Sequence, residues 1–206
     1  AQVDFLLAAG PLDRFCPALC VAVTGQPDAR RRLEELSGQN LFVKRLDDGW
    51  FRFHALFADY LRARLGRDDP ARLRHIQLSA AHWCAETGLW QEAVRYALAA
   101  GDAPCAAAWA EAWAMRRVQA GDIRTVTGWL AVLPPALVVG SLRLRLAHAW
   151  ALAFGLHLGE ARDMVSGIEA DLVSGRLPAQ AEPGELAAVK GLIAGLSDES
   201  EAAMAF

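Results

Sequence analysis

The chain has 206 residues, 54% of them apolar, and a formal charge of −3 at neutral pH. This balance excludes the global basic footprint of a nucleic-acid binder, and no apolar run reaches the roughly 18 residues that span a bilayer. Alanine and leucine supply most of the apolar residues and β-branched runs are few. The composition therefore favours a mainly α-helical globular protein with one large or two small domains.

Three short helices are predicted first, at residues 1–9, 17–23 and 29–37. Gly10-Pro11 ends the first helix, Pro17 can occupy the first turn of the second, and Asp28 is the expected N-cap of the third. Gly38 ends the third helix, so an extended segment is expected to follow.

The stretch 40–61 predicts a β-hairpin followed by a helix. Residues 40–46 and 50–53 alternate bulky apolar and charged residues, as half-buried strands do, and residues 47–49 (Asp-Asp-Gly) are a turn signal. Apolar residues then recur with the spacing of one helix face. They are Leu56, Phe57, Tyr60 and Leu61. Helices, a hairpin and a helix together predict a small winged-helix-like unit, with His54 where strand passes into helix.

A domain boundary is predicted near residues 66–70. Gly66 is expected to end the preceding helix, and Asp68-Asp69-Pro70 supplies an N-cap and a first-turn proline for the next one. We therefore expect a winged-helix-like domain at 1–66 and a helical-repeat domain at 67–206. The chain does not begin with Met and both of its ends look helical, so we expect an excised fragment, in which residues 186–206 either complete a repeat or are cut through one.

The second part repeats with a period near 34 residues, because Gly88, Gly121 and Gly155 each separate two apolar-striped segments. Stripes predicted for the later helices are Cys105, Ala108, Trp109 and Ala112; Leu142, Leu146, Ala149, Trp150 and Ala153; and Ala161, Val165, Ile168 and Leu172. One helical pair cannot bury both of its apolar faces, so stacked antiparallel pairs of the tetratricopeptide (TPR) type, forming a superhelix, are predicted. A loop at 177–184 and a helix at 185–196 complete the prediction.

Residues 40–61, NLFVKRLDDGWFRFHALFADYL, resemble the end of the winged-helix domain in the MalT-like regulators. These are LuxR-family, ATP-dependent transcription activators of the signal-transducing (STAND) class of NTPases. The segment 80–102 is similar to the part that follows the winged helix in that family. FHALFADYL also resembles the Met-His-Asp motif of the class, with Phe53 in the Met place and Ala55 in the Asp place.

The resemblance implies that His54 contacts the β-phosphate of ADP in the full-length protein and helps to hold its resting state. It also implies a central regulatory fragment of a cytoplasmic signal-transduction protein. ATP or ADP would bind an upstream NTPase module, the repeats would bind a small-molecule or protein inducer and self-associate, and a C-terminal helix-turn-helix of the same chain would bind DNA. Ala55 lacks the carboxylate of the motif, so the detailed switching behaviour does not carry over.

The chain itself is expected to be no enzyme. Lys44 and Lys190 are its only lysines and no phosphate-binding P-loop is present. No cofactor or metal is expected within the fragment, and no direct contact with nucleic acid or membrane. Four cysteines without a close CxxC pair are interpreted as reduced, packed thiols. They are Cys16, Cys20, Cys84 and Cys105.

Several alternatives stay open. His54 could cap or pack the strand–helix junction, and the arginines at 30–32 and 62–74 could form a solvated face, a contact to a neighbouring domain or a DNA contact. The tryptophans of the repeats could form an aromatic wall for a ligand as well as core. The alternative to the regulator is a TPR-like scaffold or adaptor that binds a peptide or protein in its concave groove.

Overall fold

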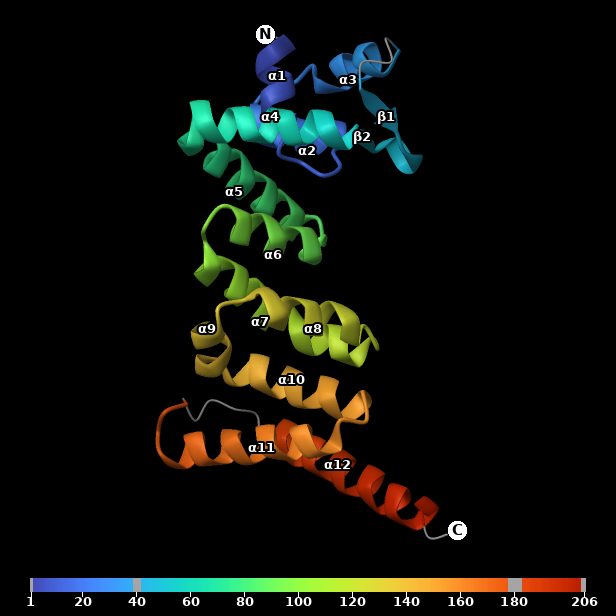
Figure 1. The fold of residues 1–206 in the computed structure, drawn as a ribbon, viewed down its shortest axis with the longest axis vertical. Coiled ribbons are helices and arrows are strands. Elements are labelled where there is room, and N and C mark those ends of the chain that lie inside the picture. The colour runs from blue at the N-terminus through green and yellow to red at the C-terminus, as the bar shows by residue number, and fades with distance from the viewer. Residues whose placement is uncertain (1, 39–41, 178–182, 205–206) are drawn as a thin grey trace. The chain divides into compact units, whose positions relative to one another are not determined.

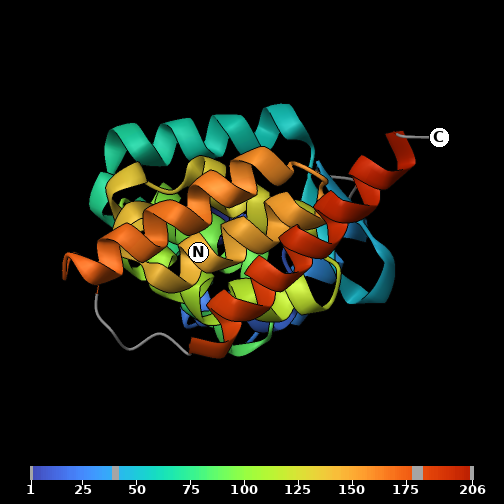
Figure 2. The ribbon, with the colours of Figure 1, turned by 90° about the horizontal axis from the view of Figure 1, so that it is seen from below.

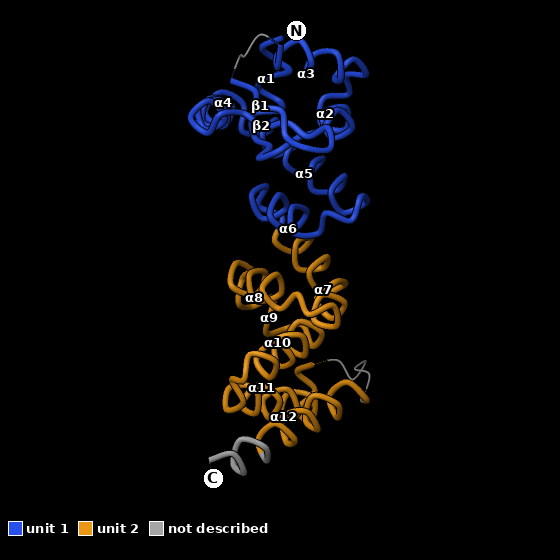
Figure 3. The backbone as a smooth tube through the Cα atoms, turned by 90° about the vertical axis from the view of Figure 1, so that its right-hand side faces the viewer, with its two compact units in different colours: residues 1–102 blue, residues 103–206 orange. Residues whose placement is uncertain are grey.

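The computed structural model describes residues 2–38, 42–177 and 183–204. Helices dominate these residues and are accompanied by one two-stranded antiparallel sheet, so the predicted mainly α fold class is confirmed (Figure 1). The chain divides into two compact units, Ala1–Asp102 and Ala103–Phe206 (Figure 3). The predicted boundary near residues 66–70 stays a prediction. Residues 40 and 41 of the predicted first strand and 178–182 of the predicted loop lie outside the described residues.

The first unit begins with the elements of a winged helix. Its elements are α1 (Gln2–Ala9), α2 (Pro17–Thr24), α3 (Ala29–Gly38), β1 (Val43–Arg45), the 3₁₀ turn η1 (Asp47–Gly49), β2 (Phe51–Phe53), α4 (Ala55–Asp68), α5 (Pro70–Glu86) and α6 (Trp90–Ala99). The three predicted early helices are thus present. The prediction that Gly66 ends α4 is wrong, because the helix continues to Asp68. It stops beside Pro70, whose ring disfavours helical geometry in the residue before it.

The hairpin pairs Val43 with Phe53, Lys44 with Arg52, and Arg45 with Phe51. Its turn contains two left-handed residues, Asp48 (φ 56°) and Gly49 (φ 78°), as the predicted turn requires. A third extended segment joins the sheet edge, since Phe15 and Phe51 exchange backbone hydrogen bonds of 2.9 and 2.8 Å. Phe15, Phe51 and Phe53 are buried, so one hairpin face closes the core of the unit.

Helix α4 buries only part of the predicted face, on which Phe57 is half-buried and packs against Phe53. Leu56 and Tyr60 are 75% and 55% exposed, whereas Leu61 and Leu65 are buried. The inward row is set by α1, which packs so closely on α4 that a Cβ at Gly10 would lie 2.5 Å from Cβ of Leu61. Spacing alone could not choose between the two faces, because both carry apolar residues.

Helices α5 and α6 form an antiparallel pair that contacts the winged helix. Helix α5 packs on α2 and α4. The backbone N–H of Asp13 donates to the hydroxyl of Tyr96 on α6 at 3.0 Å, and Arg14 forms an ion pair with Glu92 at 2.5 Å. These contacts tie the first helical pair to the loop between α1 and α2.

The second unit consists of further helices. They are α7 (Ala103–Gln119), α8 (Ile123–Val132), α9 (Pro135–Gly140), α10 (Leu142–Phe154), α11 (Leu158–Val173) and α12 (Pro183–Met204). Helix α10 packs on α7, α8, α9, α11 and α12, and α12 runs alongside α11 (Figures 1 and 2). The short α9 was not predicted. Helix α12 begins and ends beyond the predicted bounds of 185–196.

Two predicted stripes of this unit are confirmed and one is wrong. Leu142, Leu146, Ala149 and Ala153 on α10, and Ala161, Val165 and Ile168 on α11, are buried. On α7 the buried row is different from the predicted Cys105, Ala108, Trp109 and Ala112. It consists of Ala106, Ala110, Ala114 and Val118. Alanine occurs on every side of α7, so no single apolar face stands out in its sequence.

The turns between paired helices share one geometry. Their left-handed residues are Gly88 (φ 79°), Gly121 (φ 76°) and Leu156 (φ 61°). In each turn the next residue donates its N–H to the carbonyl five positions back, at 2.8 to 2.9 Å, as in a Schellman cap. The prediction of Gly155 as the third turn glycine is wrong by one residue. The left-handed residue consistently lies five positions before a buried small residue, namely Ala93, Val126 or Ala161.

Candidate functional site

His54 lies at the N-terminus of α4, where β2 ends. Its backbone N–H donates to the carbonyl of Phe42 at 2.7 Å, which closes the open end of the hairpin. The imidazole is exposed and makes no capping hydrogen bond to the helix. The ring is therefore positioned by the backbone on both sides of it, while both of its nitrogens are available to a ligand.

A pocket of about 700 Å³ opens beside this imidazole. Its walls come from the hairpin, the first turns of α4 and the loop before α2. The residues are Asp13, Phe42, Val43, Lys44, Arg52, Phe53, His54, Ala55, Ala58, Asp59 and Arg62. This volume lies within the range of small-molecule and cofactor sites.

The hairpin directs its charged side chains to the pocket by strand alternation. Val43, Phe51 and Phe53 are buried on one face, while Lys44 and Arg52 are exposed on the other. Lys44 and Arg52 are also direct cross-strand partners. Two like charges placed opposite each other destabilise a hairpin, by roughly 0.2–1 kcal/mol for such pairs.

The two carboxylates of the pocket are already paired with other arginines. Arg62 on α4 contacts Asp13 at 3.4 Å and Asp59 at 3.3 Å, and Arg95 on α6 also pairs with Asp13. Within the described part of the chain, the side chains of Lys44 and Arg52 have no ion pair or hydrogen bond. The pocket thus carries two uncompensated cations next to His54.

The dense arginine cluster of α4 and α5 is neutralised within the unit. Arg62, Arg64, Arg67 and Arg72 contact aspartates, and Arg74 donates from Nε to the carbonyl of Ala100 at 2.9 Å. Such pairing suits the predicted solvated or internally bound face better than a face that binds DNA phosphates.

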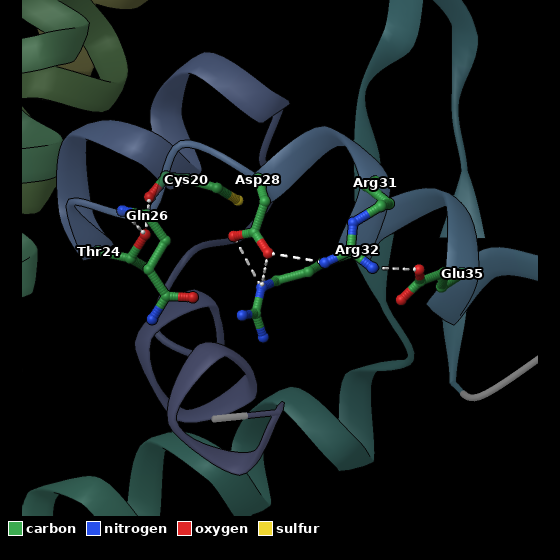
Figure 4. A network of polar contacts seen from close by, with 7 residues as sticks. All are labelled: Cys20, Thr24, Gln26, Asp28, Arg31, Arg32 and Glu35. Atoms are coloured by element: carbon green, nitrogen blue, oxygen red, sulfur yellow. Dashed lines mark hydrogen bonds and ion pairs between the residues drawn. The ribbon is translucent and has the colours of Figure 1, made fainter.

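Arg31 and Arg32, at the start of α3, are also paired (Figure 4). Arg32 donates from Nε to both oxygens of Asp28, at 2.9 and 3.0 Å, and Arg31 bridges Asp28 and Glu35. The hydrogen bond from Arg32 holds the pKa of the Asp28 carboxyl below its usual value. Asp28 precedes α3, as predicted for its N-cap, and acts here through ion pairs.

The cysteines are free thiols in packed surroundings. Cys20 on α2 and Cys84 on α5 are buried, and burial raises the pKa of the Cys84 thiol to about 12 and that of Cys20 further still. Because the thiolate is the reactive form, both groups are poor nucleophiles at neutral pH.

In the part of the chain that the structure describes, the other candidate residues singled out in the sequence form no metal site, and the tryptophans line neither pocket. Of the six tryptophans in the repeats, Trp129 is buried and the other five are half-buried, and none lines a pocket described here. Among the described residues, no group of three or more His, Cys, Asp or Glu side chains could hold a metal ion. No described helix is both long and apolar enough to cross a membrane.

A second pocket, of about 810 Å³, lies in the second unit between α7, α9 and α10. Alanines form much of its lining, and the charged groups Glu111, Arg116, Arg143 and Glu185 stand around them. The guanidinium of Arg116 stacks over the ring of Trp113 at 4.6 Å. The pocket could not be predicted from the sequence, because its wall includes the unpredicted helix α9.

A winged helix with an open basic pocket, followed by helical pairs joined by repeated turns, defines a winged-helix and helical-repeat protein. Residues 1–73 match the family of the MalT winged helix domain. The chain belongs to this MalT-like family.

Two kinds of relative share the segment. The transcriptional regulator MalT of Yersinia enterocolitica is 32% identical over 211 residues, which cover 97% of this chain and 23% of MalT. The serine/threonine-protein kinase PknK of Mycobacterium tuberculosis (H37Rv) is 39% identical over 150 residues, which cover 72% of this chain and 14% of PknK. The chain therefore spans less than a quarter of the length of these relatives.

Proposed function

We propose that this chain is a regulatory segment of a MalT-like transcription regulator, in which His54 senses bound nucleotide. In the full-length protein an upstream module binds ATP or ADP, and the imidazole donates a hydrogen bond to a phosphate of ADP in the resting state. Inducer binding to the helical repeats then favours an open form that self-associates and activates transcription. The chain performs no catalysis of its own in this proposal.

One observation carries the proposal: the His54 imidazole is exposed on the wall of a pocket of about 700 Å³ that also holds two uncompensated cations. A histidine that served only to cap α4 would use its side chain on the helix N–H groups, and His54 does not. An exposed donor in a positive pocket is suited to a phosphate.

The relatives support a regulatory role for the segment. One is named a kinase and the other a transcriptional regulator, so their outputs differ while this segment is common to both. A segment shared by proteins with different outputs is better suited to control than to either output reaction.

The test is His54→Ala in the full-length protein. We expect the affinity for ADP to fall by about tenfold, because one charge-assisted hydrogen bond is lost. We expect basal transcription to rise, because the resting state is then held less firmly. His75→Ala is the matched control, because His75 is an exposed histidine of the same unit that does not line the pocket. Unchanged ADP affinity and unchanged basal transcription in His54→Ala would disprove the proposed role.

The pocket of the second unit supports a second candidate function, that of an adaptor which binds a peptide or protein. Its lining mixes apolar residues with charged groups, which suits a peptide, although it lacks aromatic residues. If the adaptor function is correct, Arg143→Glu will abolish capture of a partner protein while His54→Ala leaves it intact. Normal nucleotide dependence of transcription in Arg143→Glu is expected under this candidate.

A further inference from the structure

We propose that Lys44 and Arg52, from opposite strands of the hairpin, bind the polyphosphate group of a nucleotide together with His54. The hairpin then contributes a site for several adjacent phosphates, and His54 is one of its three donors. This inference rests on the proposed function for the location of the nucleotide, and it adds the residues and the ligand chemistry that define the site.

The register of the hairpin brings the two cations and His54 to one face. Lys44 and Arg52 are direct partners in the pairing, so their side chains leave the same face. The pairing reaches Val43 and Phe53, and the hydrogen bond from His54 to the carbonyl of Phe42 continues it by one more residue on each strand. Successive residues alternate between faces, so Lys44, Arg52 and His54 all lie on the exposed face, and all three line one pocket.

Among the described residues of the first unit, no acidic side chain pairs with either Lys44 or Arg52. The carboxylates that share the pocket, Asp13 and Asp59, are engaged by Arg62 and Arg95. In the first unit, as far as the structure describes it, nearly all arginines outside the hairpin have an acidic or carbonyl partner, and Arg30 is the exception. The unpaired cations therefore concentrate on the hairpin.

The like charges of Lys44 and Arg52 favour a ligand that carries several negative charges. An adjacent like-charged pair is unfavourable in the free protein and becomes favourable when a multiply charged anion lies between the two groups. A single carboxylate would meet one cation well, whereas a diphosphate offers oxygens to both strands and to the imidazole. The arrangement therefore favours a polyphosphate over a singly charged ligand.

The test uses inorganic pyrophosphate as the probe and the chain of 206 residues, studied by calorimetric titration at low ionic strength. Lys44→Gln and Arg52→Gln are each expected to weaken pyrophosphate binding by about tenfold, and orthophosphate is expected to bind more weakly than pyrophosphate. Arg45→Gln is the matched control. Arg45 lies next to Lys44 on the same exposed strand, but it pairs with Phe51 and does not line the pocket.

A second readout separates binding from folding. Without anion, Lys44→Gln and Arg52→Gln should raise the unfolding temperature by about 1–3 °C, because the repulsion is removed. The same variants should show a smaller increase in unfolding temperature when pyrophosphate is added. Substitution of a residue with only a structural role would not both raise the unfolding temperature without anion and reduce the further increase caused by pyrophosphate.

Three results would overturn the inference: no pyrophosphate binding at millimolar concentration, an equal loss in Arg45→Gln, or binding of duplex DNA through Lys44 and Arg52 in place of pyrophosphate. The proposed function has a separate outcome. If His54→Ala lowers the ADP affinity of the full-length protein while Lys44→Gln and Arg52→Gln do not, the proposed function stands and this inference fails. If the two hairpin variants weaken pyrophosphate binding while His54→Ala leaves ADP affinity unchanged, phosphate binding by Lys44 and Arg52 stands, whereas His54 is neither a donor of this site nor the nucleotide sensor of the proposed function.

Discussion

Arg145 on α10 and Asp171 on α11 form an ion pair in which Nη1 of the guanidinium donates to Oδ2 of the carboxylate at 2.5 Å. The two side chains are only 10% and 18% exposed, and Arg176 contacts the other carboxylate oxygen at 2.7 Å. The hydrogen bond from Arg145 is the main cause that lowers the pKa of Asp171 below its usual value. The pair therefore joins the two helices most firmly when Asp171 is ionised.

Asp171→Asn should destabilise the chain at neutral pH and should matter less in acid. A carboxyl whose pKa is lowered on folding contributes its stability above its ordinary pKa, near 3.8, and loses it as the pH falls through the lowered value. The gap in unfolding midpoint between wild type and variant should therefore begin to narrow below about pH 4 and keep narrowing as the pH falls toward the lowered pKa. Urea unfolding followed by circular dichroism from pH 7 to pH 3 measures it, with Asp163→Asn, an exposed acid of the same helix, as the control. A gap that stays constant with pH would contradict the assignment.

Gly10→Ala should destabilise the first unit. A Cβ at this position would lie 2.5 Å from Cβ of Leu61 and 3.2 Å from the carbonyl oxygen of Leu6, so α1 and α4 would have to separate. Forced overpacking of this kind costs about 1–3 kcal/mol. Chemical denaturation gives the value.

Gly128→Ala is the contrasting substitution. Gly128 lies within α8, and nothing is within 4 Å of the place where its Cβ would be. Replacing a helical glycine with alanine at such a site should stabilise the chain by up to about 1 kcal/mol. A loss of stability in Gly128→Ala equal to that in Gly10→Ala would show that close packing is not the cause in the latter.

Leu156→Gly should stabilise the turn between α10 and α11. Leu156 is left-handed (φ 61°) and 70% exposed, so glycine removes the strain of a side chain in this conformation and gives up little burial. The expected gain is about 0.5–1 kcal/mol, and the reverse change, Gly121→Ala, should cost about 1 kcal/mol. Thermal unfolding of both variants tests the shared turn geometry, because the unfolding temperature should rise in Leu156→Gly and fall in Gly121→Ala.

Tyr96→Phe should weaken the contact between α6 and the loop before α2. The backbone N–H of Asp13 would lose its acceptor, at a cost of about 1 kcal/mol. Burial raises the pKa of Tyr96 to about 12, so folding favours the protonated phenol. Stability from this group is complete below the ordinary value of 10 and falls as the pH rises from 10 to 12. Wild type should thus lose stability over that range by more than Tyr96→Phe, which unfolding curves at pH 9 and pH 11 would show.

Local signals in the sequence predicted most of the fold. The hairpin followed from Asp48 and Gly49, which adopt the positive φ angles that the turn requires. The predicted stripe of α11 was correct because its buried residues Ala161, Val165 and Ile168 recur at helical spacing on one face. Helix α10 is buried more widely, since Leu144, Ala147 and Ala151 are buried beside its predicted stripe. Where a helix has one apolar face, its burial can be predicted before any packing is known.

The buried face of a helix was predicted wrongly where its packing partner determines which face is buried. Helix α4 carries apolar residues on two faces, and the packing of Gly10 against Leu61 selects the one that is buried. Helix α7 offers alanine on all sides, so its buried row depends on its neighbours. The left-handed residue next to Gly155 was missed because leucine rarely adopts that conformation.

The site was predicted in part. His54 was singled out by its motif and by its place at the strand–helix junction, and its contact with nucleotide stays a prediction. Lys44 and Arg52 were missed, although a symmetric hairpin around residues 47–49 pairs positions whose numbers sum to 96, which gives Lys44 and Arg52 as partners. The pairing of the two exposed cations can thus be predicted from the position of the turn. The ion pair between Asp13 and Arg95 cannot, because Arg95 lies on α6, far away in the sequence.

The contacts of Asp13 and Arg14 with α6 limit where recombination can divide such genes without loss of packing. A recombination event that joined this winged helix to foreign repeats at residue 67 would separate Asp13 and Arg14 from Tyr96 and Glu92 on α6. It would also expose the face of α2 that α5 covers. A crossover after Asp102 would carry the whole set of contacts together. Shuffling of this region between proteins with different outputs should therefore preserve α5 and α6 along with the winged helix, and tolerate variation in the repeats that follow.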